Sequence, residues 1–175
     1  MSNNIENKIQ SVQDKYYQEH TKNKIFKKAQ KKDCANKVID EVGLNNLIEK
    51  TIYYQEGTNV IWLNYHVFKK FATDDVYDQL IKYFIELIDY GKTYYTTVEI
   101  KINLDGLTIT GLERYKHIFE DSVKNLSDTH INTIDTCILM NAPTFTNQLI
   151  NLCSAIIGPS RFSNLQTKLI VISKK

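Results

Sequence analysis

The sequence predicts an α/β protein with a mostly parallel sheet of about four or five strands, joined by crossover helices and preceded by N-terminal helices. The main observation is that short β-prone runs alternate with longer helical patterns after residue 50. Strand–helix units of this length imply right-handed crossovers between parallel strands. With only 6 glycines and 2 prolines in 175 residues, the chain has too few turn residues for an all-β sandwich.

Residues 1–50 form the first of two predicted units, a lysine-rich helical segment. Apolar residues recur there at helical spacing in two stripes, and the second stripe ends near Gly43, so we expect two or three helices. The first 40 residues contain nine lysines against five acidic residues, a net charge of +4, whereas the remainder has a net charge of −2. The cluster within this segment comprises Lys22, Lys24, Lys27, Lys28, Lys31 and Lys32.

Residues 51–175 form the second predicted unit, an α/β domain. Two β-prone runs flank the turn at residues 56–59 and predict a hairpin. Thr73 stands at an N-cap position, and the buried helix that follows is expected to end at Gly91. The remaining pattern predicts a strand over 94–104, a helix over 111–126, a strand over 134–140, a helix over 145–157, a loop over 158–167 and a strand over 168–172.

Composition excludes several classes of protein. The 22 basic and 20 acidic residues give a net charge of +2, so the chain as a whole is no polycation and we expect no specific nucleic-acid partner. The three cysteines form no Cys-x-x-Cys pair, which argues against a disulfide framework or a zinc ribbon and favours a reducing compartment. No apolar run has the length of a membrane span or the form of a signal peptide. We therefore expect a soluble, cytoplasmic protein.

The sequence predicts no active site. Residues Gly106–Gly111 follow a strand and open a helix, as a nucleotide-binding loop does, but Leu112 and Glu113 stand where such a loop has Lys and then Ser or Thr. We therefore predict that these glycines end a strand and admit a helix. The four histidines are not close in sequence to one another or to a cysteine, and no nucleophile motif is present. No enzyme activity, metal or cofactor is expected.

Residues 138–145, Ile-Leu-Met-Asn-Ala-Pro-Thr-Phe, contain the most informative pattern: a buried strand runs into an Asn-x-Pro corner and a helix. A later strand begins Lys168-Leu-Ile. This arrangement resembles the CRAL-TRIO lipid-binding family, in which a strand ends in Asn-x-Pro, a following helix gates the lipid pocket and a later strand opens with Lys-Ile. Upstream, residues 102–107 resemble the family's strand ending in Asp-x-x-Gly, with Asn103 in place of the Asp. The resemblance covers residues 50–172 loosely and 98–172 more closely.

The resemblance implies a non-enzymatic lipid-binding or lipid-transfer protein that holds one lipid, or another hydrophobic small molecule, between the sheet and a gate helix over 145–157. The lysine cluster would then dock peripherally on an anionic membrane surface, at about 1 kcal/mol per basic residue. The alternative for this cluster is the solvated face of a helix. Lys168 is implied beside the head-group phosphate. The other implied lipid-binding residues are Met140, Asn141, Phe145, Leu149, Leu152 and Ile156.

The chain also departs from the family pattern. Residues 130–132, His-Ile-Asn, replace a Tyr-Pro-Glu segment whose carboxylate contacts the head group, and the chain ends soon after the last strand. The strand near residues 95–103 places Glu99 and Lys101 on one face, so that face is wet, the pocket is partly polar, or the lipid cavity is lost. The alternative function is a protein-interaction module without lipid. A third is an unrelated α/β enzyme or regulator.

Overall fold

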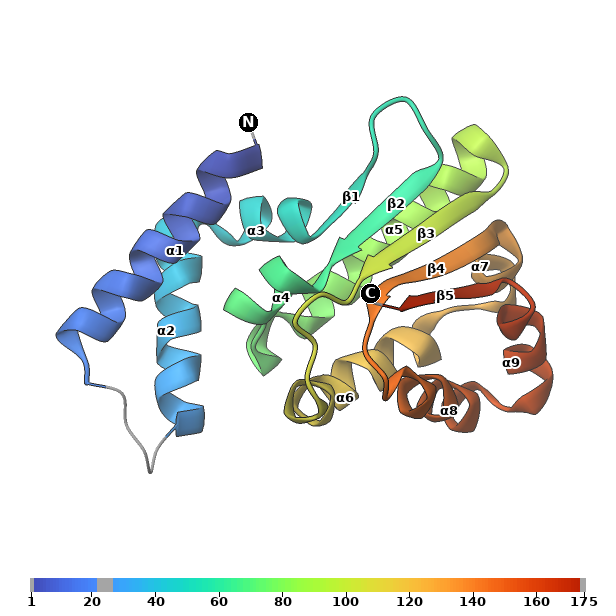
Figure 1. The fold of residues 1–175 in the computed structure, drawn as a ribbon. Coiled ribbons are helices and arrows are strands. Elements are labelled where there is room, and N and C mark those ends of the chain that lie inside the picture. Colours follow the sequence, from blue (N-terminus) through green and yellow to red (C-terminus); the bar gives the residue numbers. More distant parts are fainter. Residues whose placement is uncertain (1, 22–26, 174–175) are drawn as a thin grey trace.

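The structure, a computed structural model, describes residues 2–21 and 27–173. At its centre is a five-stranded sheet of order β1-β2-β3-β4-β5 (Figure 1). β1 (Ile52–Tyr54) pairs antiparallel with β2 (Val60–Asn64). The sheet continues in parallel through β3 (Val98–Asn103), β4 (Ile134–Ala142) and β5 (Leu169–Ser173). The predicted hairpin and the predicted α/β class with a mostly parallel sheet are both confirmed.

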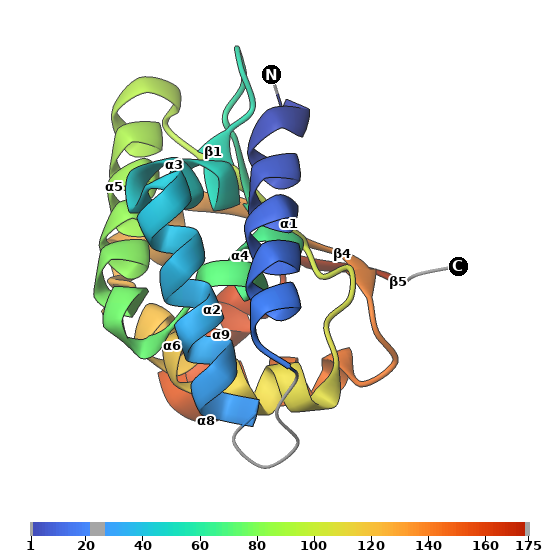
Figure 2. The same cartoon turned by 90° about the vertical axis from the view of Figure 1, so that its left-hand side faces the viewer.

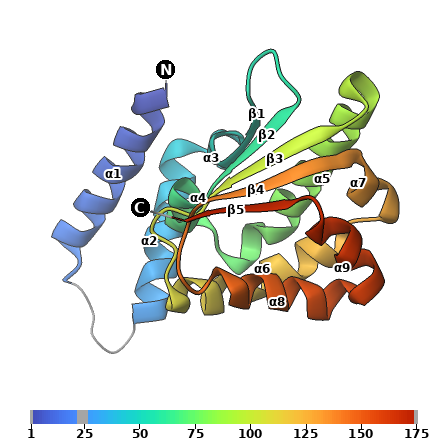
Figure 3. The same ribbon diagram turned by 45° about the vertical axis from the view of Figure 1, so that its right-hand side comes forward.

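The helices that connect the strands lie on one face of the sheet (Figures 1 and 3). This follows from the strand order, because right-handed crossovers between successive neighbouring strands all pass over the same face. These helices leave the opposite face uncovered. In chain order the connecting elements are α4 (Tyr65–Phe71), the short 3₁₀ helix η1 (Asp74–Val76), α5 (Tyr77–Tyr95), α6 (Ile109–Asn125), α7 (Asp128–Thr133), α8 (Thr146–Ile157) and α9 (Pro159–Gln166).

The N-terminal helices α1 (Ser2–Glu19), α2 (Lys27–Val42) and α3 (Leu44–Thr51) pack beside the sheet (Figure 2). α2 and α3 both contact α4, and α1 lies along α2. Val12, Val38 and Leu47 belong to the same buried cluster as the core residues of the sheet, so these helices complete one hydrophobic core. The prediction of two or three N-terminal helices is confirmed, and Gly43, at φ 91°, separates the second from the third.

The end of α5 differs from the sequence prediction. Gly91, expected to end the helix, lies buried inside it, where a Cβ atom would overlap the Val98 side chain and the Tyr54 hydroxyl. This glycine therefore permits a close approach between α5 and the sheet. The helix continues to Tyr95 and ends at Thr96, which has φ 71°, and β3 consequently begins at Val98 rather than near residue 94.

Three short helices, α4, α7 and α9, have no counterpart in the predicted elements. α9 occupies most of residues 158–167, which were predicted as a loop, and it begins with Pro159 at its first position. With 6 to 8 residues each, these helices complete too few turns to produce a clear apolar period.

β3 alternates between two environments, which explains its mixed sequence pattern. Val98 and Ile100 are buried beneath the helices, whereas Glu99 and Lys101 lie on the uncovered face and are partly exposed. There the Lys101 ammonium lies 2.8 Å from the Glu99 carboxylate and 5.7 Å from the centre of the Trp62 ring. Of the three interpretations of this strand, a solvent-exposed face is the one that agrees with the structure.

Candidate functional site

An apolar cavity of about 180 Å³ lies between the helix-covered face of the sheet and helices α5, α6, α8 and α9. The sheet contributes Ile102 and Leu139, and the helices contribute Phe119, Ile150 and Phe162, among others. The lining is almost entirely carbon. Ile150 belongs to α8, so the cavity lies beneath the segment that was predicted to be a gate helix.

The structure places the predicted lipid-binding residues at opposite ends of the sheet. Met140 and Asn141 lie at the carboxyl end of β4, and Phe145 follows them and packs against the core. Met140 is in register with Asn103 on the uncovered face, away from the apolar cavity. Lys168 directly precedes β5, at the amino end of the sheet. The side chains of Leu149, Leu152 and Ile156 lie outside the part of the chain that the structure describes.

Lys168 makes two hydrogen bonds to backbone carbonyls. Its ammonium donates to the carbonyl oxygen of Ile131 at 3.0 Å and to that of Ile134 at 2.6 Å. These two carbonyls lie in the last turn of α7 and at the start of β4, where the helix itself supplies no donors. The contacts give Lys168 a structural role at this junction, and its role beside a head group stays a prediction.

A second and larger hollow, the basic groove, has a volume of about 650 Å³ and lies beyond the carboxyl ends of β2 and β3. Ligands of parallel α/β folds commonly bind outside the carboxyl ends of the strands. The groove is bordered by α2, α4, the start of α5 and the N-terminus of α6. Its described lining residues include the cations Lys28, Lys31, Lys32, Lys69, Lys70 and Arg114, the tyrosines Tyr17, Tyr65, Tyr77 and Tyr115, the loop residues Gly106, Thr108, Thr110 and Gly111, and also Thr73 and Asp74.

The predicted membrane-docking lysines lie partly in this groove. Lys27, Lys28, Lys31 and Lys32 are exposed on α2, and all but the first line the groove. Lys22 and Lys24 lie outside the described residues. Lys69, Lys70 and Arg114 were missed by the sequence analysis because they come from α4 and α6, and α4 was not predicted at all. Only the folded chain brings these cations opposite α2.

The Gly106–Gly111 segment enters the groove as a turn followed by a helix start, as predicted. Gly106 has φ 72°, and a Cβ atom there would lie 2.6 Å from the ammonium of Lys69. The Thr108 hydroxyl caps α6 by accepting the N–H of Gly111 at 3.0 Å. Gly111 makes room for the Tyr65 hydroxyl, which would be 2.5 Å from an added Cβ. The segment lacks a lysine of its own, but lysines from α2 and α4 border it.

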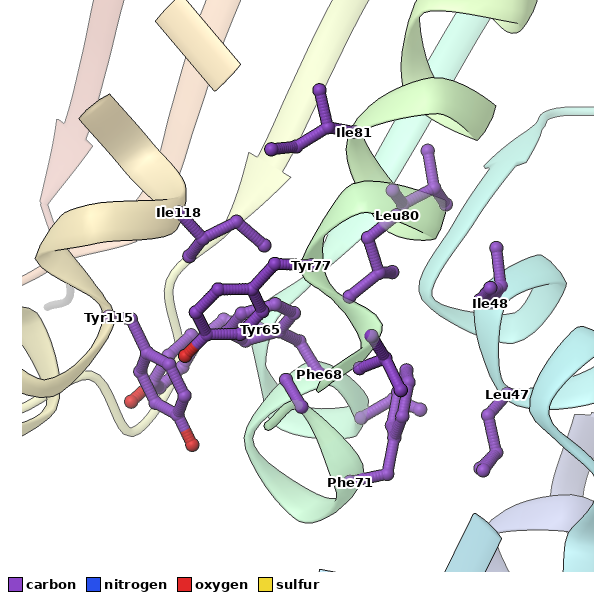
Figure 4. Close-up of a cluster of buried hydrophobic side chains, with 14 of the residues drawn as sticks. Leu47, Ile48, Tyr65, Phe68, Phe71, Tyr77, Leu80, Ile81, Tyr115 and Ile118 are labelled. Carbon is purple, nitrogen blue, oxygen red and sulfur yellow. The ribbon is translucent and has the colours of Figure 1, made fainter. Parts of the chain in front are cut away.

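Four neighbouring aromatic side chains, here called the aromatic partition, each line one of the two hollows: Tyr65, Phe68, Tyr77 and Tyr115 (Figure 4). The three tyrosines line the basic groove, whereas Phe68 lines the apolar cavity. The Tyr115 ring lies 4.8 Å from that of Phe68 and 6.0 Å from that of Tyr65. Burial, and then the neighbouring Tyr115, raise the pKa of Tyr65 to about 12. The partition is thus tightly packed.

No family model, curated protein or solved structure matches the chain. Among the described residues, no helix combines the length and the apolar character needed to cross a bilayer. Within the same residues, no group of three or more His, Cys, Asp or Glu side chains is placed to hold a metal ion. The two hollows are therefore the features from which a function can be inferred.

Proposed function

We propose that the protein binds a lipid, or another hydrophobic small molecule, without catalysing a reaction. The apolar cavity is the observation that carries this proposal, because it lies under α8, the helix that the resemblance to the CRAL-TRIO family assigns as the gate. Dry apolar cavities of about 150 Å³ in proteins admit small apolar molecules. At about 180 Å³, this cavity has room for a segment of an acyl chain.

Entry of a complete acyl chain requires α8 to move outward, because pockets for whole ligands usually measure about 300–1,000 Å³. α8 packs chiefly on α6 and α9, so its displacement leaves the pairing of the strands intact. Gly158, at φ 83°, joins α8 to α9 and provides a bend at that end. In this proposal the gate opens at an anionic membrane, on which the exposed lysines of α2 dock.

Native mass spectrometry tests the binding of lipid directly. The full chain is incubated with mixed liposomes, separated from them and weighed, and its cargo is extracted and identified. We expect one lipid per chain. Ile150→Phe, which fills the cavity, should abolish the adduct, and Ile39→Phe, at a partly buried position on α2, is the matched control. An apo mass for the unaltered chain after exposure to liposomes would contradict the proposal.

Vesicle flotation tests the docking surface. Replacing Lys27 and Lys28 together by glutamine should weaken binding to phosphatidylserine vesicles by roughly 30-fold, because each basic residue near the surface contributes about 1 kcal/mol. The matched control replaces Lys82 and Lys92, which are exposed on α5. Equal losses in the two double variants would show that overall charge, rather than α2, governs docking.

A protein-interaction role is the second candidate, and the edge strand β5 favours it. Ile170, Val171 and Ile172 are exposed by 47%, 43% and 48%, although all three are apolar. An edge strand with exposed apolar residues is a template for pairing with a strand of another chain. Sedimentation velocity tests this role: association with a second copy that Val171→Lys abolishes would support it, and a monomer at all concentrations would count against self-association.

A further inference from the structure

The described lining of the basic groove carries more basic than acidic side chains. Six cations line it, whereas Asp74 is the one acidic residue among its described lining residues. Lys32 has an ionic partner, because its ammonium lies 2.8 Å from the Asp75 carboxylate. The partner of Lys70 is neutral, the side-chain oxygen of Gln13 at 3.0 Å. The cations Lys69 and Arg114 lie over the rings of Tyr65 and Tyr115, which carry no net charge.

Burial and neighbouring cations lower the pKa values of two lysines in the groove, Lys31 and Lys69. Burial first, and then the nearby charges of Arg114 and Lys27, lower the pKa of Lys31. Burial and then Lys70 lower the pKa of Lys69, which Asp105 offsets in part. An anion in the groove would relieve this repulsion, so its binding would be favoured by every cation within reach.

The N-terminus of α6 adds hydrogen-bond donors at the same place. The first turn of α6 contains no acidic residue, and the N–H groups of Ile109 and Thr110 lie where the helix offers them no acceptor. Helix N-termini with free N–H groups bind phosphate through these donors and the helix dipole. Thr73, a lining residue that is only 8% exposed, has a hydroxyl oxygen without a hydrogen-bond partner among the described residues. The Thr73 hydroxyl in the wall of the groove is thus available for a hydrogen bond to a ligand.

We propose that the basic groove binds a small molecule bearing two or more phosphate groups. Six cations and a helix N-terminus suit several negative charges in one ligand, and Arg114 suits a phosphate that accepts two parallel hydrogen bonds. The volume of about 650 Å³ is that of a small-molecule pocket. A nucleic acid needs an extended basic track, whereas these cations gather in one hollow. A soluble compound with several phosphate groups and the head group of a phosphorylated phosphatidylinositol present this same chemistry.

This inference goes beyond the proposed function and does not depend on it, because the groove and the apolar cavity have no described lining residue in common. A chain that binds phosphate probes but no lipid would retain the inference and lose the proposed function. A chain that carries lipid but binds no phosphate probe would retain the proposed function and lose the inference.

Calorimetric titration of the full chain with tripolyphosphate tests the groove. We expect one site per chain, with an affinity that falls as salt is added. Lys69→Gln and Arg114→Gln should each weaken binding by roughly tenfold, the effect of losing one charge-assisted hydrogen bond. Lys92→Gln makes the same change of charge at an exposed position on α5 and should leave the affinity within about twofold.

A second pair of variants distinguishes a loss of binding from a loss of folding. Thr110→Asp places an acid in the first turn of α6, where the helix dipole favours it, so the thermal midpoint should be kept or raised. The same carboxylate repels a phosphate in the groove, and we expect a loss of affinity of roughly tenfold. Thr129→Asp, in the first turn of α7, is the matched control. Equal losses of affinity in the groove variants and in their controls, Lys92→Gln and Thr129→Asp, would overturn the inference.

Vesicles identify the source of the phosphate. Binding to phosphatidylinositol bisphosphate vesicles that exceeds binding to charge-matched phosphatidylserine vesicles, and that Lys69→Gln reduces, assigns a phospholipid head group. Binding of tripolyphosphate without that preference assigns a soluble ligand. If the chain binds neither tripolyphosphate nor phosphatidylinositol bisphosphate vesicles, the inference is overturned.

Discussion

The side-chain amide of Asn141 donates a hydrogen bond of 2.9 Å to Oδ1 of Asn103, joining the carboxyl ends of β4 and β3. The same oxygen accepts the backbone N–H of Asp105 at 3.1 Å. One asparagine therefore fixes both the turn that leads into α6 and the corner that leads into α8. The first of these turns borders the basic groove, and the second leads into the helix above the apolar cavity.

The backbone of Asn141 gives the first prediction. Its φ of 53° lies in the left-handed region, which asparagine tolerates better than most residues with a Cβ. Asn141→Ala should lower the free energy of unfolding by about 2 kcal/mol, through the lost hydrogen bond and the strained backbone. Asn141→Gly loses the same hydrogen bond without that strain, so it should be about 1 kcal/mol more stable than the alanine variant. Urea denaturation measures both, and equal stabilities would show that no strain is stored at this residue.

A variant of Lys168 distinguishes a structural role of this residue from a role in ligand binding. Because its ammonium donates to the carbonyls of Ile131 and Ile134, Lys168→Met should lower the free energy of unfolding by about 1–3 kcal/mol. A residue that served only a lipid head group would give the opposite result, with stability unchanged and lipid affinity reduced. Denaturation and native mass spectrometry on the same variant distinguish these outcomes.

Much of the fold could be predicted from the sequence, because each long element repeats its apolar residues over several turns or alternations. α6 and β4 were located within a few residues in this way. The location of Gly91 inside α5 could not be predicted in this way. A glycine is needed there because Tyr54 and Val98 pack closely against the helix. Tyr54 is distant from Gly91 in the sequence, so no local pattern reveals this contact.

The basic groove shows a similar limit for the candidate site. The lysines of α2 and the Gly106–Gly111 segment are both visible in the sequence, but as separate features. The segment was not predicted to be a phosphate loop, because Leu112 and Glu113 stand where such a loop has Lys and then Ser or Thr. In the folded chain, however, Lys69 lies next to Gly106. Since α4 is short and was not predicted, its cations could not be assigned to the site.

Gly91→Ala tests the close approach of α5 to the sheet. An added methyl group would overlap Val98 and the Tyr54 hydroxyl, so overpacking should cost about 1–3 kcal/mol. This cost opposes the gain of about 1 kcal/mol that alanine usually brings to a helix interior. Val98→Ala in the same chain should recover part of the loss, so a double-mutant cycle followed by urea denaturation gives a favourable coupling. A Gly91→Ala variant more stable than the unaltered chain would contradict the close packing of α5 on the sheet.

The ion pair between Lys101 and Glu99 tests whether the second face of the sheet is open. Partly exposed pairs contribute about 0–1 kcal/mol, so Lys101→Gln should change the free energy of unfolding by less than about 1 kcal/mol, and less still in high salt. Removing one partner of a buried pair would cost about 3–5 kcal/mol. A loss of that size would mean that the face is covered. Trp62 fluorescence should change in the same variant, because Lys101 lies over its ring.

Tyr65 makes the stability of the aromatic partition dependent on pH. Burial first, and then Tyr115, raise its pKa from 10.0 to about 12 in the folded chain. Between these two values the unfolded chain has lost the phenolic proton and the folded chain still holds it, so the folded state binds more protons and stability falls as pH rises. Urea midpoints should therefore decline from pH 10 to pH 12, and Tyr65→Phe should reduce the slope. Tyr94→Phe, which removes a hydroxyl from a ring that is 67% exposed, is the matched control. If both variants keep the full slope, then Tyr65 is not the group that titrates, and the partition is more open to water than its packing implies.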